Sequence, residues 1–351
     1  MFNKLFGKFS KDIAVDLGTS NTLVYVKDKG IIINEPSVVA INTRTDQILS
    51  VGEEAKRMLG KTPGHILAVR PLRNAIISDF EVTEKMMRYF IEKIHKESFS
   101  LVPRPRIIIA APLDITEVER KAVEDVAISA GAREVFLIEQ PIAAAIGARL
   151  PIQEPNGNMI VEIGGGKTEI GVISLGGLVT SKSLNIAGEK FDEDIINYIR
   201  DKYNMFLGEK SAEEIKKSVG TVMSLSKPMK TKVRGRNLLN GLPKEITVKS
   251  EEIKDAIQAS IDTIINSIKD VVEDTPPELV SDLYQRGMVL SGGGAMLREL
   301  DKLIYEETKI PVIVADDSLT TVVRGIGLVL EDFENLKELL LPATVDESYK
   351  S

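Results

Sequence analysis

The sequence predicts an α/β fold in two lobes, each built on the same motif. Residues 159–173 are typical of a strand that carries one acidic residue, Glu162, then a turn of three glycines and a second strand. Residues 13–26 repeat this order, with Asp16 as the acidic residue and Gly18 in the turn. A third glycine turn, 292–294, follows the apolar strand 288–290. The two similar hairpins indicate a duplicated fold whose halves close on a cleft.

The glycine turns indicate an anion-binding role. Backbone N–H groups in such a turn can converge on an anion, and the absence of Cβ atoms lets a phosphate come close. A carboxylate at the strand end, such as Glu162, can hold a hydrated Mg²⁺ beside it. One such hairpin alone is more often an ordinary turn. The second copy therefore carries the argument for a shared ligand.

Composition narrows the class of protein. At 351 residues, 43% of them hydrophobic and 28% charged, the chain has the size of two globular domains. A net charge of −7 argues against nucleic acid as a partner. The chain has no cysteine and only two histidines, which excludes disulfides, thiolate metal sites and a cysteine nucleophile. We expect a cytoplasmic protein.

The N-terminus has the pattern of a short helix on a membrane surface. Its apolar residues recur at helical spacing while lysines take the other face. The apolar residues are Phe2, Leu5, Phe6 and Phe9. The segment is short and contains Gly7, so a frayed terminus is the alternative. The apolar stretch 99–102 is a second candidate for contact with lipid or with a lobe.

Strand and helix signals alternate along the rest of the chain. The expected strands are 13–26, 30–41, 106–112, 135–138, 159–163, 170–173 and 288–290. The expected helices are 51–59, 80–96, 117–130, 142–148, 192–203, one begun by a capping box at Ser211, 251–274, and one that contains Met296, Leu297, Leu300 and Leu303. Residues 106–138 form a β-α-β unit, which predicts a parallel pair of strands.

Two common phosphate motifs do not fit. Gly166-Lys167-Thr168 looks like the end of a P-loop, but that pattern needs a glycine where the chain has Val161, inside the strand. No Gly-x-Gly-x-x-Gly opens a helix after the first strand, which excludes a dinucleotide fingerprint. A clamp formed by three glycine elements, 16–22, 162–168 and 291–294, remains.

The order of these elements resembles the actin, sugar-kinase and Hsp70 ATPase superfamily, and within it a divergent member of the bacterial actin family MreB. The matching segments are 16–27, 34–40, 51–56, 163–166 and 290–295. The resemblance implies a two-lobed actin-like ATPase fold of duplicated ribonuclease-H-like domains, each with a smaller subdomain. The implied boundaries are 1–150 for lobe I, with an insertion at about 33–75, and 151–335 for lobe II, with an insertion at about 185–250. A tail, 336–351, follows.

The resemblance also implies a ligand and site residues. Proteins of this family bind ATP or ADP with Mg²⁺ and polymerise into filaments at the inner face of the cell membrane, where they organise cell shape. By matching motif, Asp16 and Glu162 would lie near the metal, and Glu213 and Lys216 would flank adenine and ribose. The remaining expected nucleotide contacts are Gly18, Thr19, Ser20, Asn21, Gly164, Gly165, Gly166, Gly292, Gly293, Gly294 and Ala295. Expected partners are further copies of the chain, the membrane surface, and other bacterial actin paralogues or morphogenetic proteins.

The sequence departs from the family pattern at the chemistry. This chain has Glu162, Gln140 and Lys167 at positions where the family usually has Asp, Glu and Thr, respectively. In the family that Glu and Thr position and polarise the attacking water. Gln140 cannot accept a proton as a carboxylate does, and Lys167 places a long cation where a small hydroxyl is usual. We expect ATP to be bound but hydrolysed slowly.

Three other functions are compatible with the superfamily. A sugar or acetate kinase would need a catalytic Asp in a substrate cleft, for which the sequence offers no clear candidate. A chaperone ATPase would need a further peptide-binding domain. A purely structural filament, indifferent to ATP hydrolysis, is the serious alternative.

Overall fold

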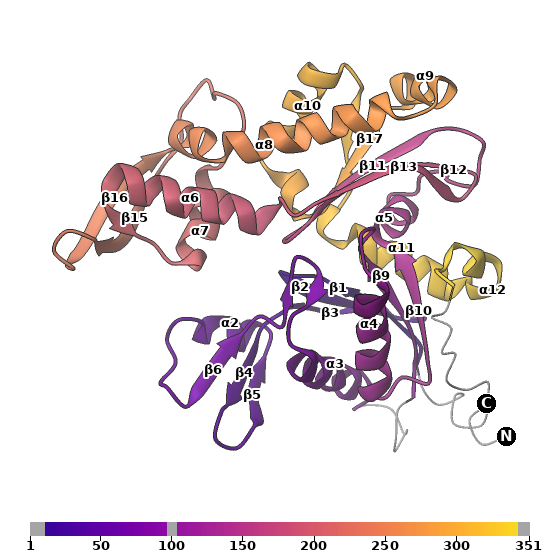
Figure 1. The fold of residues 1–351 in the computed structure, drawn as a ribbon, viewed down its shortest axis with the longest axis horizontal. Helices are drawn as coiled ribbons and strands as arrows, with labels where there is room; N and C mark the ends of the chain where they lie inside the picture. Colours follow the sequence, from indigo (N-terminus) through magenta and orange to yellow (C-terminus); the bar gives the residue numbers. More distant parts are fainter. Residues whose placement is uncertain (1–10, 97–103, 343–351) are drawn as a thin grey trace. The chain divides into compact units, whose positions relative to one another are not determined.

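The computed structural model describes residues 11–96 and 104–342, which fold into two compact units. Of the described residues, unit 1 comprises 11–96, 104–151 and 320–342, and unit 2 comprises Ile152–Leu319. The boundary lies between Pro151 and Ile152, next to the implied boundary between residues 150 and 151. Figure 1 shows the elements of both units.

Unit 1 is built on a mixed five-stranded sheet in the order β10-β9-β1-β2-β3. The strands are β1 (Ile13–Leu17), β2 (Asn21–Val26), β3 (Gly30–Pro36), β9 (Arg106–Ala111) and β10 (Glu134–Glu139). β1, β9 and β10 are parallel, whereas β1, β2 and β3 form an antiparallel meander. The predicted parallel pair of the β-α-β unit is confirmed.

Unit 2 repeats this topology with the order β13-β12-β11-β17-β18. Its strands are β11 (Asn158–Ile163), β12 (Thr168–Ser174), β13 (Gly177–Leu184), β17 (Met288–Ser291) and β18 (Val312–Val314). The meander β11-β12-β13 is again antiparallel, and β11, β17 and β18 are parallel. Each strand of the five-stranded sheet of unit 1 has a counterpart in the five-stranded sheet of unit 2, so the duplication predicted from the two hairpins is confirmed.

Side chains of the unit 1 sheet alternate between two apolar faces, because successive residues of a strand point to opposite sides. Ile13, Val15 and Leu17 of β1 share one buried cluster with helices α3 (Phe80–His95) and α4 (Glu117–Ser129). The other face carries helix α11 (Thr321–Glu331), which packs on β1, β2 and β9. Thr116 begins α4 with a capping box, one residue before the predicted helix 117–130. Figure 1 shows α3 and α4 side by side.

Helix α11 crosses helix α5 (Gln140–Gly147) at very short range. A Cβ atom at Gly325 would lie 1.8 Å from the carbonyl oxygen of Ala143, and one at Gly147 would lie 1.9 Å from that of Thr321. Only glycine allows this approach. Residues 320–335 therefore belong to unit 1, whereas the resemblance implied that lobe II extends over 151–335. The contact is formed by residues far apart in the chain, and the strand pattern alone does not reveal it.

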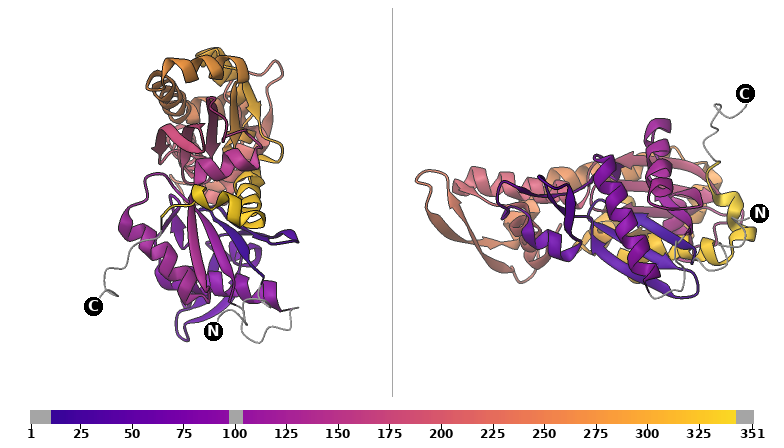
Figure 2. Two further views of the ribbon diagram at one scale, coloured as in Figure 1. Left: turned by 90° about the vertical axis from the view of Figure 1, so that its right-hand side faces the viewer. Right: turned by 90° about the horizontal axis from the view of Figure 1, so that it is seen from below.

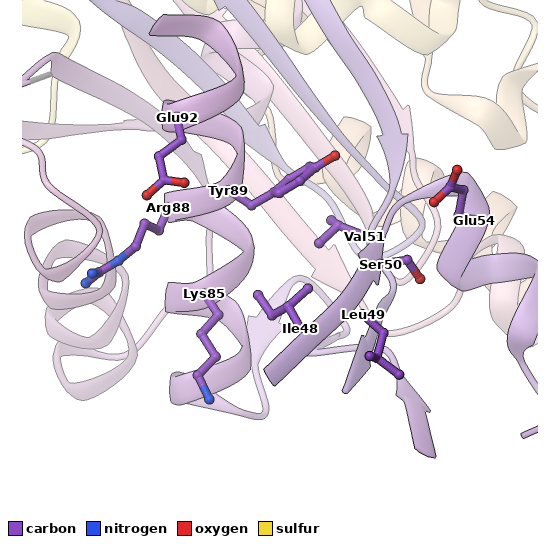
Figure 3. Close-up of a pocket in the computed structure, with 9 residues that line it drawn as sticks. All are labelled: Ile48, Leu49, Ser50, Val51, Glu54, Lys85, Arg88, Tyr89 and Glu92. Atoms are coloured by element: carbon purple, nitrogen blue, oxygen red, sulfur yellow. The ribbon is translucent and has the colours of Figure 1, made fainter. Parts of the chain in front are cut away.

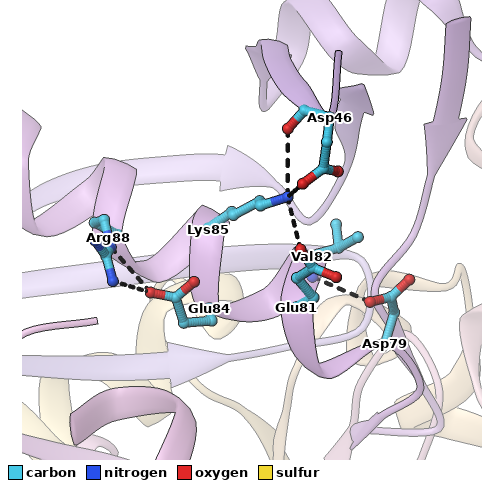
Figure 4. A network of polar contacts seen from close by, with 7 residues as sticks. All are labelled: Asp46, Asp79, Glu81, Val82, Glu84, Lys85 and Arg88. Atoms are coloured by element: carbon cyan, nitrogen blue, oxygen red, sulfur yellow. Dashed lines mark hydrogen bonds and ion pairs between the residues drawn. The ribbon is translucent and has the colours of Figure 1, made fainter. Parts of the chain in front are cut away.

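A small subdomain interrupts unit 1 within the range expected for the first insertion. It contains the sheet β5-β4-β6 and helix α2 (Glu53–Met58). Its strands are β4 (Val39–Asn42), β5 (Gln47–Val51) and β6 (Ile66–Val69), and the short hairpin β7 (Leu72–Arg73) and β8 (Ile76–Ile77) follows. The ammonium of Lys85 on α3 lies 2.5 Å from the Asp46 carboxylate in the β4–β5 turn and 3.1 Å from that of Glu81 (Figure 4). These ion pairs fasten the subdomain to α3.

A surface pocket lies between β5 and α3, next to these ion pairs (Figure 3). Its lining mixes apolar side chains with charges of both signs. The lining residues are Ile48, Leu49, Ser50, Val51, Glu54, Lys85, Arg88, Tyr89 and Glu92. The glycine turns are not part of it.

Unit 2 covers its sheet with long helices and carries its own small sheet. The helices are α6 (Gly188–Tyr203), α7 (Glu209–Val219), α8 (Ser250–Glu273), α9 (Pro277–Arg286) and α10 (Leu300–Thr308). The small sheet contains β14 (Met205–Phe206), β15 (Lys230–Asn237) and β16 (Pro243–Lys249), and the hairpin β15–β16 projects from unit 2 (Figure 2).

Two predicted helix starts in unit 2 are wrong. Helix α7 begins at Glu209 behind Gly208, so Ser211 lies inside the first turn and does not cap it. Residues Gly293–Met296 form a short 3₁₀ turn, and the following α-helix begins only at Leu300. Glycine-rich segments lower helix stability, which explains the delayed start.

The C-terminal part of unit 1 is short and packs on the sheet. Helix α12 (Phe333–Leu336) places Phe333 against Phe136, with ring centroids 5.0 Å apart, and the Leu341 N–H donates to the Leu137 carbonyl at 2.8 Å. The predicted membrane residues Phe2, Leu5, Phe6 and Phe9, and the stretch 99–102, lie outside the described residues. Within residues 11–96 and 104–342, no helix is long and apolar enough to cross a membrane.

Candidate functional site

In unit 1 the predicted site residues gather at the carboxyl ends of parallel strands. Asp16 lies near the end of β1, and Gln140 follows the end of β10 as the first residue of α5. β1 and β10 both pair with β9, so their carboxyl ends lie at the same edge of the sheet. Ligands of open α/β sheets bind at this edge.

The glycine turn of unit 1, residues 18–21, is held by one residue that sequence reasoning gave no role. The hydroxyl of Ser37 donates to the Gly18 carbonyl at 2.6 Å, and the Ser37 N–H donates to the Ser20 carbonyl at 2.9 Å. In a trans peptide the N–H points away from the preceding carbonyl. Because Ser37 binds these two carbonyls, the N–H groups of Thr19 and Asn21 point to the opposite side of the turn.

Side chains of the same turn bind neighbouring segments of unit 1. The buried Thr19 hydroxyl accepts a hydrogen bond of 2.7 Å from the N–H of Ala75 in the β7–β8 turn. The Asn21 amide donates to Asn34 on β3 at 2.9 Å. A Cβ at Gly18 would lie 2.6 Å from the Asn21 carbonyl, so the tight turn requires glycine there. Hydrogen bonds therefore tie the turn to β3 and to the β7–β8 turn.

In unit 2 the acidic residue lies in a row of buried polar groups. Glu162 on β11 is opposite Glu169 on β12 and opposite Ser291 on β17. All three residues are less than 5% exposed. The Glu162 carboxylate lies close to Gly292, where a Cβ would come within 2.5 Å of its Oε1 and where the backbone has a positive φ of 81°. Both the close contact and the positive φ require glycine at position 292. Gly292 is the first residue of the predicted nucleotide-binding run 292–295.

The glycine turn of unit 2 is held by the start of helix α6. The N–H groups of Gly188 and Glu189 donate to the carbonyls of Gly164 and Gly165 at 3.2 and 2.8 Å. The Gly164 N–H closes the turn on the Lys167 carbonyl at 2.9 Å. By the same trans-peptide geometry, the N–H groups of Gly165 and Gly166 point away from α6. Both units thus present a turn whose carbonyls are bound and whose N–H groups face outward.

Lys167 lies at the end of this turn and is only 3% exposed. The next residue, Thr168, is also buried, and its hydroxyl donates to the Ile186 carbonyl at 2.6 Å. A buried ammonium requires nearby negative or polar groups, because a desolvated charge is costly. Lys167, at the position where the resemblance implies a threonine, is thus buried at the end of the glycine turn.

Of the two residues expected to flank adenine and ribose, Lys216 makes the more informative contacts. Its ammonium donates to the Gly188 carbonyl at 2.6 Å and lies 2.9 Å from the Asp192 carboxylate. Glu213 lies one turn earlier on α7 and pairs with Lys217 at 2.6 Å. The structure therefore brings Lys216 to the α6 end of the glycine turn.

Burial shifts the charge state of two carboxyl groups in these half-sites. Desolvation raises the pKa of Asp16 to about 7. Desolvation also raises the pKa of Asp192 to about 6, although the Lys216 ammonium acts in the opposite direction. A cation near Asp16 would favour its charged form. The Asp16 carboxyl therefore suits a site that is completed by a divalent cation.

Each glycine turn, taken by itself, fits a phosphate group. The outward N–H groups of such a turn suit phosphate oxygens. Mg²⁺ on nucleotides takes most ligands from phosphate and water and needs only one or two carboxylates. Asp16 beside the turn of unit 1 and Glu162 beside the turn of unit 2 are each a carboxylate of this kind, and the described residues contain no cluster of three or more metal-binding side chains. Three residues that were not predicted as site residues also lie at or near these turns: Ser37, Gly188 and Asp192. Of these, only Ser37 lies in a segment, 34–40, that matches the family motif.

Comparison with known proteins agrees with this geometry. The family model described as MreB/Mbl protein matches residues 10–338. The chain is 51% identical to the cell shape-determining protein MreB of Escherichia coli strain K12, over 94% of the chain and 96% of that protein. It is 47% identical to the cell shape-determining protein Mbl of Bacillus subtilis strain 168, over 93% of the chain and 98% of that protein.

Solved structures show the same fold. MreB5 of Spiroplasma citri bound to ADP matches with a TM-score of 0.88 at 35% identity, covering 94% of the chain and 98% of that structure. The MamK double helical filament matches with a TM-score of 0.78 at 22% identity, covering 92% of the chain and 99% of that structure, which shows the fold alone. With the duplicated sheets and the glycine turns, these matches establish an actin-like fold, and the chain belongs to the MreB/Mbl family of actin homologues.

Proposed function

We propose that this protein binds ATP and ADP with Mg²⁺, polymerises into filaments at the inner face of the cell membrane, and organises cell shape or movement. Relatives that share about half of its residues are cell shape-determining proteins. The MreB5 structures that it matches are bound to ADP and to AMPPNP. The turns 18–21 and 164–167 supply N–H groups suited to phosphates.

The proposal includes slow hydrolysis of ATP. The observation that carries it is the burial of Lys167 at the end of the glycine turn, where the family pattern has a threonine. An ammonium there can neutralise a terminal phosphate, but it can neither accept a proton nor act as the small hydroxyl does. Gln140 at the carboxyl end of β10 can orient a water but cannot act as a carboxylate base.

A phosphate-release assay tests this part. The double variant Lys167→Thr with Gln140→Glu should release phosphate faster than the native protein, by about tenfold or more. Lys182→Thr is the matched control, since Lys182 lies on β13 of the same sheet and pairs with Asp270 at the surface. The control should match the native rate. If the native protein releases phosphate as fast as the double variant, slow hydrolysis is wrong.

The alternative is a structural filament whose assembly does not depend on hydrolysis. Sedimentation and electron microscopy with ATP, ADP and AMPPNP separate the two proposals. A nucleotide-dependent filament assembles with ATP and AMPPNP and less with ADP. Equal assembly in all three conditions, and without nucleotide, supports the structural filament.

Membrane attachment rests on the pattern of Phe2, Leu5, Phe6 and Phe9. Flotation with anionic vesicles tests it on filaments of the full-length chain. Replacing Phe2 and Phe6 by Ser should leave pelleting unchanged and abolish flotation. Unchanged flotation would locate the membrane contact elsewhere.

A further inference from the structure

We propose that the ion pair between Asp192 and Lys216 is a positioning device for the glycine turn 164–166, acting through the first turn of helix α6. The inference rests on the proposed binding of nucleotide phosphates at this turn. It gives Lys216 a different role from contact with ribose. Asp192 has no role in the sequence analysis.

The first link joins the glycine turn to α6. Gly188 and Glu189 use their N–H groups to hold the carbonyls of Gly164 and Gly165. These two hydrogen bonds fix the peptide planes and hence the direction of the N–H groups of Gly165 and Gly166. A rotation of the α6 start would turn the same N–H groups away from a phosphate.

The second link holds the start of α6 from the other side. The Lys216 ammonium donates to the carbonyl of Gly188 at 2.6 Å. Gly188 is therefore bound through both its N–H and its carbonyl. A Cβ at Gly188 would lie 3.3 Å from the Gly164 carbonyl oxygen and 3.4 Å from the Lys216 ammonium, so three groups meet closely at this residue.

The third link fixes Lys216. Its ammonium lies 2.9 Å from Asp192 Oδ1, one turn further along α6, and both side chains are 15% exposed. An ion pair that is largely shielded from solvent restricts the positions open to the long lysine side chain. Helix α7 is in turn packed against α6. Asp192 thus acts through Lys216 and Gly188 on a turn that it does not touch.

Binding assays on the full-length protein separate a positioning role from contact with ribose. Asp192→Asn and Lys216→Met should each weaken the binding of ATP, 2′-deoxy-ATP and inorganic tripolyphosphate by the same factor, about tenfold. Contact of Lys216 with the sugar would instead weaken ATP and spare tripolyphosphate. Lys216→Arg, which keeps the charge and the donors, should bind all three ligands to within about threefold of the native protein.

Asp194→Asn is the matched control. Asp194 lies on the same helix, is also 15% exposed, and pairs with Lys190 at 2.7 Å. Among the described residues, Asp194 also accepts a hydrogen bond from the Ser260 hydroxyl and makes no hydrogen bond or ion pair with the glycine turn. Its removal should therefore leave ATP binding unchanged. Thermal unfolding of both Asn variants checks that they fold alike.

The outcomes are distinct. Absence of ATP binding by the native protein overturns the proposed function. Native ATP binding together with unchanged affinity in Asp192→Asn overturns the positioning role alone, as does a loss in Lys216→Met that is confined to ligands with a sugar. If Asp192→Asn does not fold, the contrast between Lys216→Met and Lys216→Arg decides the same question.

Discussion

The crossing of α5 and α11 gives the most stringent test of the fold. In Gly325→Ala the new Cβ would lie 1.8 Å from the Ala143 carbonyl oxygen, 2.7 Å from the carbonyl carbon and 2.9 Å from the Gly147 nitrogen. All three are backbone atoms of a helix, so none can rotate away. To reach even 3.0 Å, α5 and α11 must separate by about 1.2 Å.

The magnitude follows from two opposing effects. Overpacking of this kind costs about 3 kcal/mol or more when backbone must move. Alanine in a helix interior recovers about 1 kcal/mol relative to glycine. We therefore expect the free energy of unfolding of unit 1 to fall by about 2 kcal/mol or more.

Urea denaturation measures the change, and hydrogen exchange of amides in α5 and α11 locates it. Gly64→Ala is the matched control, because a Cβ there meets nothing within 4 Å. That variant should change the free energy of unfolding by less than about 1 kcal/mol. A Gly325→Ala protein as stable as the native one would refute the close crossing and the placement of residues 320–335 in unit 1.

Two further predictions concern the half-sites. Ser37→Ala removes the hydroxyl that donates to the Gly18 carbonyl. It should weaken ATP binding about tenfold and lower the free energy of unfolding by about 1 kcal/mol, both measured by calorimetry. Unchanged affinity would show that the turn holds its shape without Ser37. The second prediction concerns pH. Burial raises the pKa of Asp192 from 3.8 to about 6. Between pH 4 and 6, the Asp192 carboxyl is therefore protonated in the folded protein and ionised in the unfolded protein. The free energy of unfolding that this group contributes therefore falls as pH rises from 4 to 6, by about 3 kcal/mol at most. In urea titrations over this pH range, the free energy of unfolding of the native protein should therefore fall relative to that of Asp192→Asn. A constant difference between the two proteins would contradict the raised pKa.

Much of the fold follows from local pattern. The hairpins around Asp16 and Glu162 begin with short, nearly continuous apolar runs that break at glycines, and this pattern predicts strand, turn and strand. The capping box at Thr116 fixed one helix start, since its hydrogen bonds lie within one turn. The box expected at Ser211 failed because Gly208 and Glu209 already begin that helix.

The sequence by itself determined the two glycine hairpins, the duplicated order of strands, and the unusual residues Gln140 and Lys167. These features are local, because they depend only on the residue types and on the backbone conformations that neighbouring residues allow. Only the tertiary structure decided that α11 returns to unit 1, that Ser37 holds one glycine turn, and that Asp192 and Lys216 hold the start of α6 behind the other. Those arrangements depend on contacts between segments 19 to more than 180 residues apart, whose geometry is set by packing and which no pattern of neighbouring residues encodes.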